Sequence, residues 1–473
     1  MLQSVIVVLM LLPCVCGKNP AIQVTLNDKG LQYGKHAGTD WIQEKLERVT
    51  FPDITGDVLG FIHYTLTGTR VKQCDLPEPS VQFYPDAKGI KTSISGLNIA
   101  LTGGWTTHCG IIHDGGSFDM AVFSVDVASV VELGNDTNGH LSVTSVKCDA
   151  QVGGVDVQFH GGASWIFKPF VKYFKDRISS EIQMNICSNV KKIIENLEQY
   201  LQATNVSLDL DRVLTFDFPL TGSPDVNVSS LHLGFKGEFY NTKTHVEPPF
   251  EAQPFTMPDQ QGYMLSVGLS EFTLNSASYA LYSAGVFQAV INDSMIPPGS
   301  PVHLNTSLMG PFVPELPKMF PGLMMNLQVY AREVPVFSFQ PDAVKLSFQG
   351  AVKAFAIQRN GTQTPLFKLN VDSEFSSKVW IAGGRVKASI SMDNLTLTLA
   401  GSEVGTVKID ALESLVKMGV KIALVKLNNQ LSEGIVLPRM KWAQLVNSVL
   451  KVEQGFIALA SDAQVLLTDG GFD

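Results

Sequence analysis

One long apolar stripe limits the shapes that this chain can adopt. Apolar residues recur at helical spacing from Phe167 to Leu201, and Phe170, Phe174 and Ile178 are among them. A helix of roughly 35 residues is about 50 Å long at 1.5 Å per residue, which exceeds the diameter of a small domain. Only an elongated body can use such a helix.

Two other segments follow the helical period, from about residue 28 to 49 and from about 410 to 431. Pro52 and Gly434 stand just beyond them, where helix-ending residues belong. Their apolar positions include Leu31, Trp41 and Leu46 in the first segment and Leu412, Val416, Ile422, Ala423 and Leu427 in the second. The sequence therefore predicts three amphipathic helices.

Most of the remaining chain alternates apolar and polar residues at period two, which is typical of half-buried strands. The alternation is clear at residues 97–101, 344–348, 386–392 and 395–399. Glycine-containing turn signals at 114–116, 138–139 and 383–384 favour antiparallel neighbours. We therefore expect an α+β fold.

A proline-rich segment at 246–262 divides the chain. Its four prolines exclude a regular helix or a central strand and predict an extended linker. The linker separates a domain at 18–245 from one at 263–473, and each has a long helix near its end. A divergent duplication is expected, and the linker either joins mobile domains or is pinned along a rigid rod.

The N-terminus predicts secretion. Residues 1–17 contain a short apolar run and end in small residues, as a cleaved signal peptide does, and no later apolar run is long enough to span a bilayer. Four cysteines then remain, which allows three pairings in an oxidising compartment. Seven Asn-x-Ser/Thr sites are candidate glycan positions: Asn135, Asn205, Asn227, Asn292, Asn305, Asn360 and Asn394.

The charge balance excludes nucleic acid as a partner. Lys and Arg number 35 against 44 Asp and Glu, and residues 1–250 hold 19 of the basic and 26 of the acidic ones. A field of this sign repels polyanions. No motif of a hydrolase, metalloprotease, nucleotide-binding protein or dehydrogenase is present, so we expect no enzyme and no catalytic residue.

Two groups of polar residues are candidate sites of chemistry. A metal site at His108, Cys109, His113 and Asp114 is less favoured than a strand and turn with exposed histidines. Asp209 and Asp211 would share one face of a strand, but a solvated surface explains them better than acid/base catalysis because no partner group accompanies them. We expect neither a metal nor a cofactor.

The apolar stripes have two interpretations, a plain core or a lipid pocket between sheet and helix. Burying each acyl methylene stabilises a complex by roughly 0.8 kcal/mol, so a two-chain lipid could be held against water. The candidate pocket residues are Leu31, Trp41, Leu46, Phe170, Phe174, Ile178, Leu412, Val416 and Ile422.

Short motifs recur in order along the whole chain. They include Asn-Pro-Ala at 19–21, Lys-Gly-Leu-Gln-Tyr at 29–33, Gly-Gly-Ser-Phe-Asp at 115–119, Pro-Pro-Phe at 248–250, Gly-Leu-Ser-Glu-Phe at 268–272, Met-Ile-Pro at 295–297, Phe-Val-Pro-Glu-Leu at 312–316 and Phe-Ser-Phe-Gln-Pro at 337–341. The chain thereby resembles the bactericidal/permeability-increasing protein and lipopolysaccharide-binding protein family.

The resemblance implies an elongated boomerang of two similar barrels, each a twisted antiparallel sheet with long amphipathic helices, joined by a central sheet. It implies a phospholipid in an apolar pocket of each barrel, a monomer, and a disulfide between Cys148 and Cys187. Cys74 and Cys109 are then expected to form a second bridge, which adds to the family pattern.

The chain departs from the family where basic hairpins should engage the phosphates of lipid A. Residues 58–63 and 102–108 hold no Lys or Arg, and none occurs between Lys91 and Lys147. The basic cluster of that half lies on the long helix, at Lys168, Lys172, Lys175, Arg177, Lys191 and Lys192. A solvated helix face explains this cluster better than a binding role.

Two functions follow from the resemblance. The first is a secreted innate-immune protein that binds lipopolysaccharide of Gram-negative outer membranes and has bactericidal activity. The second is a carrier of zwitterionic or neutral lipids, which the missing basic tip favours. An enzyme has no supporting residues.

Overall fold

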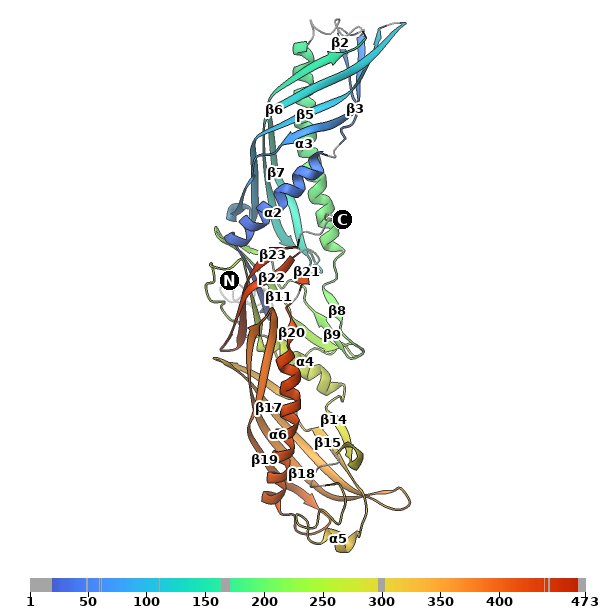
Figure 1. The fold of residues 1–473 in the computed structure, drawn as a ribbon, viewed down its shortest axis with the longest axis vertical. Helices are drawn as coiled ribbons and strands as arrows, with labels where there is room; N and C mark the ends of the chain where they lie inside the picture. Colours follow the sequence, from blue (N-terminus) through green and yellow to red (C-terminus); the bar gives the residue numbers. More distant parts are fainter. Residues whose placement is uncertain are drawn as a thin grey trace, which may run out of the picture.

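In the computed structural model the chain forms an elongated body, with a sheet and a long helix toward each end and a further sheet in the middle (Figure 1). The structure describes residues 19–47, 50–58, 60, 62–109, 111–162, 171–296, 303–437, 439–440 and 443–466. The expected signal peptide at 1–17 lies outside them.

The first end, which we call the N-terminal barrel, is a curled antiparallel sheet with strand order β2-β3-β5-β6-β7 and with β4 paired to β5. Its elements are α2 (Asp28–Glu47), β2 (Ile54–Val58), β3 (Ile62–Asp75), β4 (Ser80–Tyr84), the 3-10 helix η1 (Pro85–Ala87), β5 (Gly89–Cys109), β6 (Ile112–Asn135), β7 (Leu141–His160) and α3 (Val171–Gln202). Ile178 and Ile182 of α3 pack with Trp105 and Phe118 of the sheet in one buried core.

The other end, the C-terminal barrel, repeats this plan with strand order β14-β15-β17-β18-β19-β20. Its elements are α4 (Glu271–Ser283), β14 (Gln288–Asn292), the 3-10 helix η3 (Asp293–Met295), α5 (Leu316–Met319), β15 (Met325–Ala331), β16 (Val336–Gln340), β17 (Ala343–Ile357), β18 (Gln363–Ala382), β19 (Arg385–Ser402), α6 (Ile409–Glu433) and β20 (Ile435–Val436). Leu412 of α6 packs with Leu395 and Leu397 of β19.

A central sheet of seven strands joins the barrels, in the order β10-β11-β1-β13-β23-β22-β21. Its strands are β1 (Ile22–Asn27), β10 (Asp225–Val226), β11 (Ser230–Phe235), β13 (Leu265–Ser270), β21 (Arg439–Met440), β22 (Ala443–Glu453) and β23 (Phe456–Val465), and a small sheet beside it holds β8 (Ser207–Asp209), β9 (Leu214–Asp217) and β12 (Glu238–Asn241). Strands β1 and β13 pair antiparallel, with Val24 opposite Val267. Each half thus begins and ends in this sheet, as a duplication predicts.

The proline-rich linker is pinned to the central sheet. The side-chain amides of Asn19, Gln23 and Asn27 donate to the carbonyls of Ala252 (3.0 Å), Phe255 (2.8 Å) and Gln260 (3.1 Å), respectively. Asn19 precedes β1, whereas Gln23 and Asn27 are four residues apart on it and therefore share one face of the strand. Of the two alternatives, the structure supports the pinned linker.

The three predicted helices are confirmed as α2, α3 and α6, although residues 48–49 and 163–170 lie outside the described ones. The sequence reading missed α4. Its buried residues are Phe272, Thr273, Ser276, Ser278 and Ala280. Since four of these are small and three are polar, α4 carries no apolar stripe for the periodicity to reveal.

The predicted turns at 138–139 and 383–384 are confirmed as the β6–β7 and β18–β19 connections. The turn predicted at 114–116 is wrong, because these residues lie inside β6. A Cβ on Gly116 would stand 2.0 Å from the carbonyl oxygen of His160 and 2.8 Å from Nε1 of Trp105. This glycine therefore permits close packing rather than a turn.

Of the two expected disulfides, Cys148–Cys187 is present and ties β7 to α3. The expected Cys74–Cys109 bridge is wrong. Cys74 lies opposite Ile99 in the β3–β5 ladder, and Cys109 is ten residues further along β5. At about 3.3 Å per residue the two are roughly 33 Å apart, far beyond the reach of a disulfide.

Candidate functional site

The structure divides the predicted pocket residues into two groups. Ile178 (0% exposed) and Leu412 (4% exposed) lie inside packed cores, and Leu31 and Val416 pack against buried clusters. Ile422 is 64% exposed. Phe170 lies outside the described residues, as do the side chains of Trp41, Leu46 and Phe174.

The last third of α3 has an apolar flank that the sheet does not cover. Ile193, Leu197 and Tyr200 follow one another at spacings of four and three residues and are 67%, 46% and 66% exposed. They lie beside the buried Ile194, which packs with Phe83 and Leu133. The apolar face of α3 is therefore wider than its contact with the sheet.

Helix α6 has a similar flank. Met418, Ile422 and Val425 recur at the same spacing and are 45%, 64% and 64% exposed. The polar face of the helix is fixed to β19, because Glu413 accepts hydrogen bonds from the Lys417 ammonium (2.6 Å) and the Leu397 backbone N–H (3.0 Å). The bond from Lys417 and then that from Leu397 hold the pKa of Glu413 below its usual range.

These two flanks, which we call the α3 flank and the α6 flank, are the candidate lipid-binding surface. Each is a run of large apolar side chains that contact water in the absence of a ligand. Covering apolar surface stabilises a complex by roughly 25 cal/mol per Å². The apolar periodicity of the sequence includes Ile193, Leu197 and Ile422, but only the packing shows that these side chains stay uncovered.

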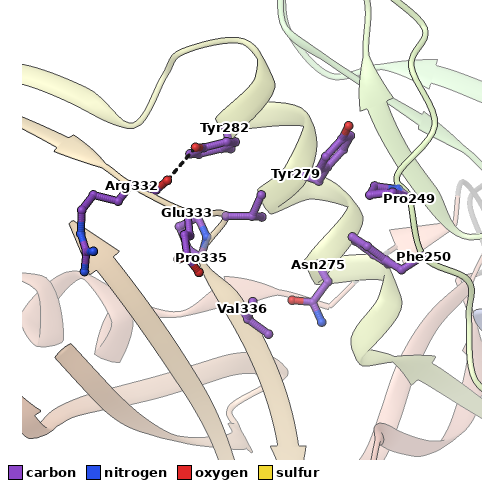
Figure 2. Close-up of a pocket in the computed structure, with 10 residues that line it drawn as sticks. Pro249, Phe250, Asn275, Tyr279, Tyr282, Arg332, Glu333, Pro335 and Val336 are labelled. Atoms are coloured by element: carbon purple, nitrogen blue, oxygen red, sulfur yellow. Dashed lines mark hydrogen bonds between the residues drawn. The ribbon is translucent and has the colours of Figure 1, made fainter. Parts of the chain in front are cut away.

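A separate groove of about 570 Å³ lies between the linker, α4 and residues 332–336, and sequence reasoning missed it. It is lined by Pro249, Phe250, Asn275, Tyr279, Tyr282, Arg332, Glu333, Val334, Pro335 and Val336 (Figure 2). Tyr282 Oη donates to the Arg332 carbonyl (3.0 Å) and Ser278 Oγ donates to the Pro335 carbonyl (2.6 Å), which fixes α4 against this segment. Its size is that of small-ligand sites.

Of the basic residues of α3, Lys175, Arg177 and Lys191 lie beside acidic partners. Lys175 lies 2.7 Å from Asp156 of β7, and Arg177 lies 2.9 Å from Glu181 on the same helix. Lys172 and Lys192 are exposed, and Lys168 lies outside the described residues. The helix therefore presents scattered charges rather than a cluster aimed at one ligand.

Asp209 and Asp211, the candidate residues for acid/base catalysis, have structural roles. Asp211 is not on a strand: its carboxylate accepts the backbone N–H groups of Val213 (2.6 Å) and Leu214 (2.8 Å) in the turn before β9, which lowers its pKa. Asp209 accepts from Thr215 Oγ1 (2.6 Å). Within the described part of the chain, no three His, Cys, Asp or Glu side chains are grouped to hold a metal ion.

The candidate glycan sites differ in exposure. Asn135, Asn205, Asn227, Asn360 and Asn394 are exposed, whereas Asn292 and Asn305 are half-buried. Among the helices that the structure describes, none is both long and apolar enough to cross a membrane.

Comparisons with known proteins agree with this architecture. The chain is 35% identical to a bactericidal permeability-increasing protein of Sebastes schlegelii over 96% of its own length and 97% of that protein. It is 26% identical to the human lipopolysaccharide-binding protein over 98% of each chain. A crystal structure of lipopolysaccharide binding protein matches the fold with a TM-score of 0.58 and 23% identity, and the match covers 95% of this chain and 100% of the other.

Two domain families account for most of the sequence. Residues 30–197 match the N-terminal domain and residues 208–465 the C-terminal domain of the LBP / BPI / CETP family. The chain therefore belongs to this family, whose members bind or transfer lipids and are not enzymes.

Proposed function

We propose that this chain is a secreted, monomeric innate-immune protein that binds the lipid A part of lipopolysaccharide and acts against Gram-negative bacteria. The observation that carries the proposal is its similarity, over nearly the whole chain, to proteins named for permeability-increasing and lipopolysaccharide-binding activity. In the absence of lipid A, phospholipid acyl chains would cover the same apolar flanks.

The α3 flank and the α6 flank would bind the acyl chains. Each flank exposes three large apolar side chains over two helical turns. Acyl methylenes laid along them would remove both partners from water, with a gain of about 0.8 kcal/mol for each buried methylene. Binding of this kind depends little on salt, because it involves no exposed ion pairs.

Titration of the purified protein with lipid A vesicles, at low and high salt, tests the proposal. We expect saturable binding with little salt dependence at neutral pH. Leu197→Glu and Ile422→Glu should weaken it at least tenfold, because each places a charge within a flank. Gln199→Glu is the matched control, since Gln199 is exposed on the opposite side of α3 from Leu197.

Absence of lipid A binding would overturn the proposal, and so would equal binding by Leu197→Glu and by Gln199→Glu.

The second candidate, a carrier of zwitterionic or neutral lipids, is favoured by the lack of Lys and Arg between Lys91 and Lys147. If this candidate is right, organic extracts of the protein should contain phosphatidylcholine or neutral lipid, and the protein should not bind lipid A.

Secretion is tested by N-terminal sequencing of protein released from expressing cells. The released protein is expected to start at Lys18.

A further inference from the structure

Three histidines and an aspartate form a row across β2, β3, β5 and β6 of the N-terminal barrel. Strand β2 lies at the end of this barrel farthest from the central sheet (Figure 1). Asp57 of β2 lies opposite His63 of β3. His63 in turn lies opposite His108 of β5, and His108 lies opposite His113 of β6. Residues directly opposite one another share a face of the sheet, so all four side chains stand side by side. We call them the histidine row.

The row is on the outer face of the barrel. All four side chains are exposed, whereas Trp105, three residues from His108 and on the other face, is only 2% exposed. The imidazole of His63 is hydrogen-bonded to the Asp57 carboxylate. The rings of His108 and His113 meet edge to face, with their centroids 3.6 Å apart.

Among the described residues, other charged and titratable side chains near the row lie on β3, β6 and β7. Asp114 follows His113 on β6, and its Oδ1 accepts the backbone N–H of Gly115 (2.8 Å). On β7, His160 Nε2 lies 3.3 Å from Oδ2 of Asp119, a carboxylate whose Oδ1 is 3.8 Å from Lys72 Nζ. The sequence has no Lys or Arg at 49–69, 92–146 or 148–167. Imidazoles are therefore the groups that can make these strand ends positive.

We propose that the histidine row is a pH-gated binding site for the phosphate groups of an anionic lipid surface, closed near neutral pH and open at acidic pH. Imidazoles gain their charge between about pH 8 and 5. With neutral rings the four side chains carry a charge of −1 from Asp57, and with three protonated rings they carry +2. This inference rests on the proposed function, because it adds a headgroup site to the acyl-binding flanks.

Phosphate suits this geometry. Adjacent imidazolium rings repel each other. An anion that accepts hydrogen bonds from the N–H groups of both rings offsets this repulsion. Cross-strand side chains stand about 5 Å apart, within reach of the several oxygens of one phosphate. Beside the row, Ile111 in the β5–β6 connection is 96% exposed, so it can enter the apolar layer of the same membrane.

Vesicle flotation with phosphatidylglycerol tests the gate, because the charge of a phosphodiester does not change over the range used. Two or three added charges near an anionic surface predict roughly a 10- to 100-fold rise in partitioning between about pH 7.5 and about pH 5.5. Vesicles of phosphatidylcholine should show no such rise. Added inorganic phosphate, a free source of the same group, should compete only weakly.

Variants identify the residues. H63Q/H108Q/H113Q should lose the rise, whereas H36Q/H245Q/H303Q, which removes three histidines elsewhere, should keep it. H63K/H108K/H113K should bind phosphatidylglycerol at both pH values, because its charge is permanent. Circular dichroism confirms that each variant is folded. A rise that survives in H63Q/H108Q/H113Q, or that the wild-type protein lacks, would overturn the proposal.

The gate and the proposed function fail separately. Lipid A binding at about pH 7.5 without an acid-dependent rise on phosphatidylglycerol would overturn the gate alone. The rise without any lipid A binding would support the gate and overturn the proposed function. Equal competition by inorganic phosphate and by vesicles would indicate a site for the free anion and would overturn the membrane assignment.

Discussion

Asn27 Nδ2 lies 3.1 Å from the carbonyl oxygen of Gln260, which joins the end of β1 to the linker 233 residues later. The same amide also donates to the Tyr263 carbonyl (3.0 Å), and the Asn27 side chain is buried. One short side chain thus satisfies the carbonyl of Gln260 in the linker and that of Tyr263 just after it, which explains how a proline-rich segment without regular structure keeps one path.

Asn27→Ala should lower the free energy of unfolding by about 1–3 kcal/mol, because it leaves two carbonyls without their donor. It should also speed proteolysis within the linker. Denaturant unfolding and timed digestion measure the two effects. Gln253→Ala is the control, since Gln253 is an exposed linker residue. Equal digestion of both variants would contradict the pinning role of Asn27.

Removing the Cys148–Cys187 disulfide should destabilise the N-terminal barrel. The bridge closes a loop with a sequence separation of 39 residues, and the loop-entropy relation gives about 4 kcal/mol for that length. The double variant Cys148→Ala/Cys187→Ala should therefore unfold at lower denaturant concentration, and reductant should shift the wild-type protein toward it. A further shift of the double variant on reduction would contradict the assignment.

Gly116→Ala should destabilise the sheet by about 1–3 kcal/mol, because the added methyl overlaps the carbonyl oxygen of His160 and displaces Trp105. It should also change the tryptophan emission, since Trp105 Nε1 donates to that carbonyl (3.2 Å). Gly104→Ala is the matched control, because its Cβ would meet Thr67 Oγ1 at 3.4 Å, an ordinary contact. A smaller loss for Gly116→Ala than for Gly104→Ala would refute this reading.

Stability at acidic pH should depend on Asp462. Burial acts to raise the pKa of Asp462, but hydrogen bonds from Lys29 and Asn447 outweigh it and hold the pKa below the ordinary 3.8. As the pH falls, the unfolded chain takes up this proton first, so the stabilisation is present above that ordinary pKa and is lost as pH falls through the folded-state value.

Asp462→Asn should therefore flatten the fall in unfolding free energy below about pH 4. Denaturant titrations at several acidic pH values measure that slope. Asp176→Asn, on the exposed face of α3, should leave the slope unchanged. A wild-type slope in Asp462→Asn would show that this carboxylate does not link folding to pH.

The sequence predicted the local structure better than the long-range pairing. The stripes that ended at Leu201 and Leu431 gave helices close to their observed ends, because each helix buries one face. The glycines at 114–116 led to the wrong prediction of a turn, because close packing against Trp105 favours glycine as a turn does. The pairing of Val24 with Val267 left no local signal, because it depends on both halves being folded.

For the candidate sites too, the sequence predicted local features but not those that depend on long-range pairing. The period of α6 identified Ile422 as an apolar position, but its exposure depends on how far β19 covers the helix. His108 and His113 are near neighbours in sequence, so the sequence alone brings them together as candidates. His63 joins them only through the register of β3 with β5, which no local pattern encodes.

The central sheet also constrains how the protein can be divided. A cut in the linker region would separate β1 from β13 and leave the N–H and C=O groups that join Ile22–Leu26 to their partners without hydrogen-bonded neighbours. Each separated half would have an exposed strand edge, and such an edge can pair with the same edge of a second copy. Each half thus covers the strand edge that the other half would otherwise expose. A truncated fragment would have to cover its own edge in another way to remain a monomer.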